Sequence, residues 1–449
     1  MEYLGFPSPS AQGLKTTSIV CGLTGDMDPY LLQRYNVGPD DNFVFKRLAV
    51  RSVRQNIHPV QLLHNHSLRK QLEKLVSPDV GVKLISLFFR FVYPHFPILS
   101  PAQSAEPERS NPSNLAVIYL VTLPFVGFDD YLSVQIAYDL PDAEELWNLS
   151  LNVLHQELHE LDLSVLQTLV LLLISPPHKP LMPDYATKWS LVGTTVTVAQ
   201  TLGLHFNSTF WSIPNAEIEL RKRLWWTVKM IVWHAAVLGR SCLIHDDDWL
   251  VLPPSLDGFS EEERTTLFPA QFIHIAAADS QSASQDEEIS LSDALFLGGH
   301  FVKVLLFRAI LRPFNALRYR TVPTSSTDEH RELEACRLAR AGAKGCIASF
   351  VAFTSNLKSS WIYGFWPFWC TLGWSTLCNL ALLLHATADS PEEAQECRTL
   401  LDQARIAVRL QSKSLDILRF SLLRIHSIFW KGLDSVFIRN GIVGNMSFG

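Results

Sequence analysis

The sequence predicts an all-α fold. Apolar residues recur at intervals of three and four along most of the chain, and the alternating pattern typical of β-strands is almost absent. Several of these runs open with a helix-capping pattern, in which Ser or Asp stands three residues before Glu or Gln. A chain of 449 residues can also bury a large core and form two or three compact units.

The composition and the charge of the chain disfavour several kinds of function and structure. The charged fraction is 18% and the net charge is −6, whereas a chain that binds nucleic acid by itself usually carries a basic balance or a basic face. This disfavours DNA binding by the bulk of the chain. The seven cysteines include no CxxC pair, which indicates reduced thiols rather than a disulfide framework or a zinc site. The first residues, MEYLGFPSPS, do not have the pattern of a signal peptide.

Residues 1–78 are expected to form an N-terminal segment that is partly disordered. Residues 1–20 are rich in Ser, Pro and Gly, and residues 46–74 are the most basic stretch of the chain. The favoured interpretation of the basic stretch is a solvated helical face, and the alternative is an anion or nucleic-acid contact. The candidate contact residues are Lys46, Arg47, Arg51 and Arg54.

Helices are predicted in order along the rest of the chain. A helix over 79–93 ends in FVYPHFPIL, where two prolines interrupt it, and an apolar helical run follows at 115–123. The final helices are expected over 392–412 and 413–438. Further helix starts are predicted at Asp142 before Glu145, Ser164 before Gln167, Ser260 before Glu263, Ser326 before Glu329, and Ser390-Pro391 before Glu393.

Residues 189–254 contain the most distinctive pair of predicted helices. The first helix has an apolar stripe and ends at Gly203, since glycine readily adopts the left-handed conformation that closes a helix. The stripe consists of Trp189, Val192, Val196, Ala199 and Leu202.

The second helix of the pair is predicted to begin near Pro214–Asn215, where Asn can cap and Pro fits the first turn. Glu217 and Glu219 stand four residues before Arg221 and Arg223, which predicts two ion pairs. Beyond them, Lys229 is the single formal charge, so most of the helix must be buried. A proline-closed extended piece is expected to follow, up to residue 254.

Residues 359–387 contain no Asp, Glu, Lys or Arg and are long enough to span a membrane. Pro367, His385 and several small polar residues favour a buried core helix instead, since a large all-α core needs a helix that is apolar all round.

Candidate chemical sites are few. His155 and His159 in HQELH have the spacing of two metal ligands on a helix, but the Glu of the zinc-protease pattern is replaced by Gln156, so an exposed helical face is favoured. Asp246, Asp247 and Asp248 are consecutive, which favours a solvated loop over a cation site. Phosphate-loop and hydrolase motifs are absent.

Two further features remain open. The tryptophan-rich run 361–374 favours aromatic packing in a core, and a ligand pocket is the alternative. Residues 279–290 are acidic and are expected to form a surface loop, in which Ser282 and Ser284 are candidates for phosphorylation.

Several motifs in 88–254 resemble, in order and spacing, the middle homology region of fungal binuclear zinc-cluster transcription factors. The matching pieces are FFRFVYPHFPIL (88–99), SVLQTLVLLL (164–173), AQTLGLH (199–205), ELRKRLWWT (219–227), LGRSCLIHDDD (238–248) and VLPP (251–254). The segment GLTGDMDPYLL (22–32) also resembles a subgroup of these regulators linked to nitrogen-source utilisation.

The resemblance implies a helical regulatory domain of the fungal-specific transcription factor type over 79–390, followed by amphipathic C-terminal helices over 391–449. It also implies a nuclear regulator of RNA polymerase II genes. The family-motif residues, to which it assigns structural roles, are Pro94, Phe96, Pro97, Leu202, Gly203, Leu204, His205, Arg221, Arg223, Trp225, Trp226, Gly239, Arg240, Asp248 and Pro253.

The chain departs from the family pattern at two places. The family reads DNA through six cysteines that hold two zinc ions, but the single cysteine before residue 242 is Cys21, so no metal or other cofactor is expected in this chain. The Asp-Arg pair that usually follows the "WW" helix is replaced by His234-Ala235. No catalytic residues are predicted.

We therefore expect a regulator that reaches DNA through a DNA-binding or dimeric partner, responds to a nutrient or metabolite, and is not an enzyme or a membrane protein. The alternatives are a truncated form of a complete zinc-cluster activator and a helical ligand-binding protein or enzyme.

Overall fold

The structure is a computed structural model. It describes residues 59–99, 111–136, 139–159, 161–176, 185–211, 213–237, 240–255, 299–301, 303–311, 326–357 and 364–431. Within these residues every regular element is a helix and no strand occurs, which confirms the all-α prediction.

The chain forms two compact units. The first comprises residues 1–178 and 184–290, and the second comprises residues 179–183 and 291–449. The regulatory domain expected over 79–390 runs across this division, and its limits stay a prediction.

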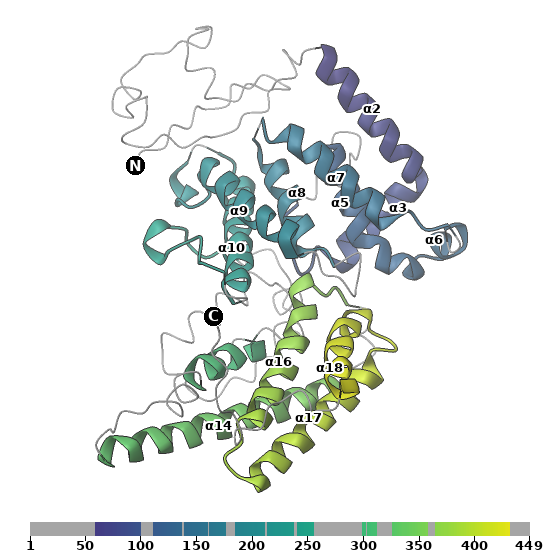
Figure 1. The fold of residues 1–449 in the computed structure, drawn as a ribbon. Coiled ribbons are helices and arrows are strands. Elements are labelled where there is room, and N and C mark those ends of the chain that lie inside the picture. The colour runs from purple at the N-terminus through teal and green to yellow at the C-terminus, as the bar shows by residue number, and fades with distance from the viewer. Residues whose placement is uncertain are drawn as a thin grey trace, which may run out of the picture. The chain divides into compact units, whose positions relative to one another are not determined.

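The first unit contains most of the motif residues and is built from helices in sequence order (Figure 1). Their bounds are α2 (Pro59–Leu75), α3 (Pro78–Phe91), α5 (Pro112–Thr122), η4 (Leu123–Phe128), α6 (Asp130–Gln135), α7 (Ala143–Glu157), α8 (Leu163–Ile174), α9 (Tyr185–Thr201), η5 (Ser208–Phe210), α10 (Asn215–Val237) and η6 (Asp246–Asp248).

The core of this unit lies along α5 and α8. Helix α5 packs against α3, α7 and α8, and all of its residues are buried. Its sequence, LAVIYLVT after the first turn, has no polar face, as expected of a helix that neighbours cover on every side. A buried amide of α5 finds its partner on a neighbouring helix: Asn114 Nδ2 donates to Thr168 Oγ1 of α8 at 3.3 Å.

The predicted helix starts are partly confirmed. The Asp142 carboxylate accepts hydrogen bonds from the backbone N–H groups of Glu144 and Glu145, and Ser390 Oγ accepts from Glu393 N–H. The start predicted at Ser164 is wrong. Helix α8 begins at Leu163 and is capped by Asp162, whose carboxylate accepts from Val165 N–H at 2.9 Å.

The second unit is organised around α16, which packs against α14, α17 and α18 (Figure 1). The bounds are α14 (Ser326–Ser355), α16 (Phe368–Ala386), α17 (Pro391–Gln411), η7 (Asp416–Leu418) and α18 (Arg419–Lys431). The predicted apolar helix is thus a core helix, and it starts after Pro367. Within the described stretches, no helix is long and apolar enough to cross a bilayer.

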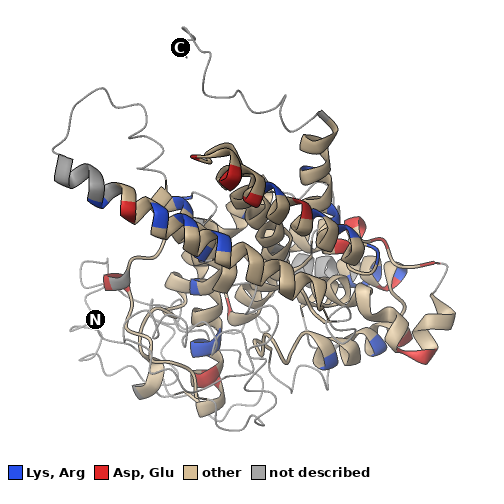
Figure 2. Cartoon of the chain, turned by 90° about the horizontal axis from the view of Figure 1, so that it is seen from below, with Lys and Arg blue, Asp and Glu red and all other residues tan. Residues whose placement is uncertain are grey.

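Figure 2 shows that most of the described ribbon is neither acidic nor basic, in keeping with the low charged fraction. Several predictions fall outside the described residues. These are Lys46, Arg47, Arg51 and Arg54, the segments 1–20 and 22–32, the start at Ser260, the loop 279–290 with Ser282 and Ser284, Trp361, and Gly239.

Candidate functional site

The family-motif residues meet around helix α10. As predicted, the helix begins at Asn215 directly after Pro214, and it is buried almost continuously from Leu224 to Ala235. This burial follows from its sequence, because Lys229 is the single charge in that stretch. Lys229 itself lies over the ring of Trp249, with Nζ 3.5 Å from the ring centroid, so its charge faces an aromatic surface.

Arg221 joins α10 to the end of α9. Its side chain is 2% exposed. The Nε donates to Glu217 Oε1 at 2.9 Å, which confirms the predicted ion pair, and one terminal nitrogen donates to the Leu202 carbonyl oxygen at 2.9 Å. The guanidinium also lies 5.2 Å from the centroid of the Trp211 ring. Arg221 therefore caps one helix while it belongs to another.

Gly203 ends α9 in the way the sequence predicts. Its φ is 73°, in the left-handed region, and Gly203 N–H donates to the Gln200 carbonyl while Leu204 N–H donates to the Ala199 carbonyl. This pair of hydrogen bonds is the Schellman arrangement. It leaves the Leu202 carbonyl available to Arg221.

We expect Gly203→Ala to lower the free energy of unfolding by about 1–2 kcal/mol, because an L side chain is strained in the left-handed conformation. Gly193 is the matched control, since it lies inside α9 and a Cβ added there would meet nothing within 4 Å. Gly193→Ala should raise stability by about 0.5–1 kcal/mol. Urea unfolding of both variants measures the difference, and shifts of the same sign would contradict the assignment.

Arg223 joins α10 to the segment after α3. Its Nε donates to the Pro97 carbonyl oxygen at 2.8 Å, across 126 positions of sequence, and the neighbouring Phe96 is fully buried. The predicted ion pair between Arg223 and Glu219 is wrong. Glu219 instead accepts from Lys222 Nζ at 2.8 Å, because the Arg223 side chain turns towards the Pro97 carbonyl.

The segment after α10 is held to the same helix. Glu219 Oε2 accepts from Ser255 N–H at 2.7 Å, and Trp226 Nε1 donates to the Leu252 carbonyl at 3.2 Å. The predicted extended piece is therefore an irregular segment that side-chain hydrogen bonds hold against α10. In this segment Val251 is buried and Pro253 is exposed.

His205 and Trp225 lie at the centre of this cluster, with ring centroids 6.1 Å apart. Burial lowers the pKa of His205, and the nearby Asp248 carboxylate opposes this shift. His205 Nδ1 and Trp225 Nε1 have no hydrogen-bond partner in the described part of the chain. The His205 carbonyl accepts from Leu250 N–H, which places the irregular segment beside the end of α9.

The remaining motif residues lie at the edge of the cluster. Arg240 is exposed and its guanidinium lies 5.3 Å from the ring centroid of Trp189. Asp248 is exposed and accepts from His245 N–H at 3.3 Å, closing a short 3-10 turn. Pro94 precedes the buried Phe96 in the turn after α3.

His234, which departs from the family pattern, is buried in α10. Its Nδ1 lies 2.7 Å from the Met230 carbonyl oxygen one turn earlier. Burial lowers the pKa of His234 to about 4, and the hydrogen bond to Met230 only partly opposes this. The folded protein therefore holds this imidazole neutral.

This predicts a loss of stability in mild acid. Below pH 6.5 the unfolded chain protonates His234 while the folded chain does not, so stability falls as the pH drops towards the folded pKa of about 4. Between pH 7.5 and pH 5 the wild type should lose about 2 kcal/mol more than His234→Gln. Urea unfolding at the two pH values measures this, and equal losses would contradict it. Other titrating groups cancel in the comparison.

The other candidate chemical positions carry no assembled site. His155 is exposed in the last turn of α7, as predicted, and His159 lies just beyond that helix. Among the described residues, no three or more His, Cys, Asp or Glu side chains form a group that could hold a metal ion. Trp366, Trp369 and Trp374 are buried core residues, in agreement with the packing interpretation, and Trp374 Nε1 donates to Thr354 Oγ1 at 3.2 Å.

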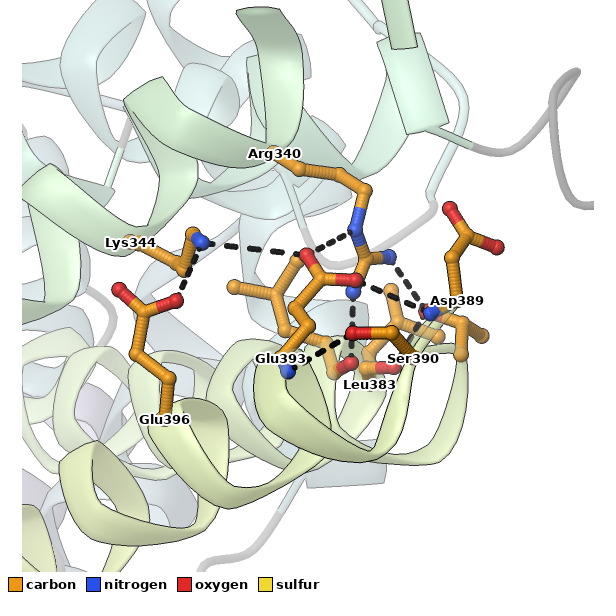
Figure 3. A network of polar contacts seen from close by, with 9 residues as sticks. Arg340, Lys344, Leu383, Asp389, Ser390, Glu393 and Glu396 are labelled. Atoms are coloured by element: carbon orange, nitrogen blue, oxygen red, sulfur yellow. Dashed lines mark hydrogen bonds and ion pairs between the residues drawn. The ribbon is translucent and has the colours of Figure 1, made fainter. Parts of the chain in front are cut away.

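The sequence analysis missed a polar network in the second unit (Figure 3). Arg340 of α14 is buried and donates to Glu393 Oε1 at 2.8 Å, to Thr387 Oγ1 at 2.9 Å and to the Leu384 carbonyl at 2.8 Å. Lys344 extends it by pairing with Glu396 at 2.7 Å. One signal was present, since Glu393 is the capping-pattern residue of α17. Its partner on α14 could not be inferred from spacing.

Lys188 was also missed. It is 5% exposed, and its Nζ donates to the Ser175 carbonyl at 2.7 Å, at the end of α8. Like Arg221, it satisfies a carbonyl at the C-terminus of a neighbouring helix. In the α10 cluster, three charged side chains bind main-chain groups and so hold four segments of the first unit together: those of Arg221, Arg223 and Glu219.

Comparison with known proteins agrees with this motif set. Residues 85–298 match the sequence family described as the fungal specific transcription factor domain. The chain is 29% identical over 42% of its length to an uncharacterized transcriptional regulatory protein of Schizosaccharomyces pombe, covering 29% of that protein. It is 30% identical over 48% of its length to the transcriptional activator protein DAL81 of Saccharomyces cerevisiae, covering 22% of it.

A shorter match, 36% identical over 18% of the chain, is to the aurofusarin cluster transcription factor of Gibberella zeae, of which it covers 12%. The matches thus span less than a third of each of these relatives. No solved structure matches the chain. Every family-motif residue around α10 falls within the matched range, so the motif set and the match to the fungal specific transcription factor domain identify the same part of the chain.

Proposed function

We propose that the protein is a nuclear regulator of RNA polymerase II transcription that acts through its helical domain. The observation that carries this proposal is the family match over 85–298, which contains the whole α10 cluster. The names of its relatives as transcriptional regulators support it. Because Arg221 and Arg223 donate to main-chain carbonyls of neighbouring segments, these two arginines build the domain rather than read DNA.

The proposed route to DNA is indirect. The 449 residues have a net charge of −6 and a single cysteine before residue 242, so neither a basic balance nor a six-cysteine cluster lies within them. The domain would pair with a DNA-binding partner, or with a second copy, and change recruitment at promoters in response to a small-molecule effector. The resemblance of residues 22–32 to nitrogen-utilisation regulators suggests genes of nitrogen-source use.

Two measurements test this together. Chromatin immunoprecipitation of the tagged protein in its own host should enrich promoter fragments, and deletion of the gene should change transcripts of the same promoters. Purified chain should not bind those promoter fragments site-specifically in a gel-shift assay. Absence of promoter enrichment would overturn the regulatory role, and tight site-specific binding by the purified chain would overturn the indirect route.

The second candidate is a complete zinc-cluster activator of which this chain is a part. The observation that favours it is the length of the relatives, because the chain spans less than a third of each of the three. Transcript sequencing across the region upstream of the codon for Met1 tests it. Six in-frame cysteines in CxxC-type spacing, followed by basic residues, would establish it, and an in-frame stop codon without them would exclude it.

A further inference from the structure

The second unit presents an exposed apolar surface along α17 and α18, which pack side by side (Figure 1). Ile406 and Leu410, one turn apart on α17, are 52% and 61% exposed. Leu423 and Trp430, two turns apart on α18, are 50% and 92% exposed. We call these four residues the α17–α18 surface. Fully exposed tryptophan is rare on a surface without a partner, and tryptophan is among the residues that contribute most to protein interfaces.

A row of arginines separates the two apolar stripes. Arg398, Arg405 and Arg409 follow one another at intervals of seven and four along α17. Arg398 and Arg405 both lie over the Phe429 ring of α18, with guanidinium carbons 5.0 and 4.1 Å from its centroid. The row therefore lies at the junction of the two helices.

The segment from Arg398 to Lys431 is basic on a chain that is acidic as a whole. From 398 to 431 the basic residues are Arg398, Arg405, Arg409, Lys413, Arg419, Arg424 and Lys431, and the acidic residues are Asp402 and Asp416. Both carboxylates are already paired, Asp402 with Arg398 and Arg405, and Asp416 with Arg419. Arg409 and Lys413 are exposed and make no ion pair within the described residues.

The pKa of a neighbouring histidine, His426, is affected by the same positive charges. Burial lowers the pKa of His426, and the charges of Arg405 and Arg409 lower it further. A negatively charged partner would offset these charges.

The combination of exposed aliphatic and aromatic side chains with unpaired cations selects a class of partner. An amphipathic helix with apolar residues at intervals of three, four and seven would cover the four apolar side chains. Asp or Glu on its flanks would pair with Arg409 and Lys413. Duplex DNA would use the cations but leave the leucines and tryptophan in water, since affinity for DNA comes chiefly from phosphate contacts.

We propose that the α17–α18 surface is a docking site for an acidic amphipathic helix of a partner protein. This deepens the proposed function, because it supplies a surface through which the regulator would join a partner. The binding itself can be measured on the purified chain without any promoter.

The experiment is a selection from a displayed library of random 16-residue peptides on the full purified chain, followed by fluorescence anisotropy with the enriched peptides. The expected peptides are net acidic with apolar residues at helical spacing. Arg409→Glu/Lys413→Glu should weaken their binding by about tenfold or more, as expected for the loss of close interfacial charge pairs. Leu423→Ser/Trp430→Ser should do the same through the apolar contacts.

The matched control is Arg331→Glu/Arg337→Glu, a double charge reversal at exposed positions of α14, which should leave peptide binding unchanged. Circular dichroism checks that every variant keeps its helix content. Enrichment of basic or non-amphipathic peptides, no enrichment, or equal loss in the control variant would each overturn the proposal. Binding of duplex DNA or phosphatidylserine vesicles through Arg409 and Lys413, with no peptide bound there, would overturn it in favour of another ligand.

Failure of the docking site and failure of the regulatory role give different results. Peptide binding with no promoter enrichment would retain the docking site and reject transcription. Promoter enrichment that persists in the Leu423→Ser/Trp430→Ser variant, with no peptide selected, would retain transcription and reject the docking site.

Discussion

Arg340→Met is expected to lower the free energy of unfolding of the second unit by about 3–5 kcal/mol, the usual cost of removing one partner from a buried ion pair. The substitution removes the hydrogen bonds to Glu393, Thr387 and the Leu384 carbonyl at once. Glu393 would keep the Asp389 N–H, which donates to Oε2 at 3.0 Å, and Lys344 at 3.9 Å, so a carboxylate that is largely shielded from water would lose its main charged partner.

Urea unfolding measures the total change, and hydrogen exchange of peptides from α14 and α17 assigns it to this unit. Arg337→Met is the matched control, because Arg337 stands one turn earlier on α14 in an exposed ion pair with Glu334. It should change stability by no more than about 0.5 kcal/mol. Arg340→Met/Glu393→Gln should recover part of the loss, since the uncompensated charge is gone. A double variant as unstable as the sum of the two single variants would contradict the pairing.

Arg221→Met should lower the stability of the first unit by about 2–4 kcal/mol, because a fully buried charge-assisted capping interaction is lost. The Leu202 carbonyl would lose its donor at the end of α9, and the Trp211 ring would lose the cation beside it. Glu217 is 32% exposed and can be hydrated, so the loss should be somewhat smaller than at Arg340.

Hydrogen exchange gives the sharpest readout here. Amides of the last turn of α9 and the first turns of α10 should exchange faster in Arg221→Met, while those of α14 and α17 should be unchanged. Arg221→Lys should fall between wild type and Met, because one ammonium cannot reproduce the guanidinium's bonds to both Glu217 and Leu202. Lys83→Met, which breaks an exposed ion pair with Asp129 at 3.6 Å, is the control. Equal effects of Arg221→Met and Lys83→Met would exclude a capping role.

Structural features that are determined by residues close in sequence were predictable from the sequence. Gly203 closes α9, Pro214–Asn215 precedes α10, and Ser390 caps α17, since each depends on groups within one turn of sequence. The burial of α16 was also predictable, because a helix without charges has no face that favours water.

The wrong prediction of the start of α8 shows the limit of what a local sequence pattern can determine. Asp162 and Ser164 are both good capping residues, and each stands three before a helical position. The tertiary structure shows which of them is used: Asp162 caps the helix, and Ser164 lies inside its first turn. The side chain of Gln167 is directed to a distant group instead, since its Nε2 donates to the Ile98 carbonyl at 2.7 Å, across 69 positions of sequence.

The groups that accept hydrogen bonds from the arginines could be identified only from the tertiary structure. Three arginines donate hydrogen bonds to distant main-chain carbonyls. Arg221 donates to Leu202, Arg223 to Pro97 and Arg340 to Leu384. Nothing in a sequence distinguishes one main-chain carbonyl from another, and only the packing of helices shows which carbonyls at helix ends and turns face a neighbouring side chain. The family motif therefore identified Arg221 and Arg223 but not Arg340, and the reason arginine occurs at all three positions is a distant carbonyl that the folded chain brings within 3 Å.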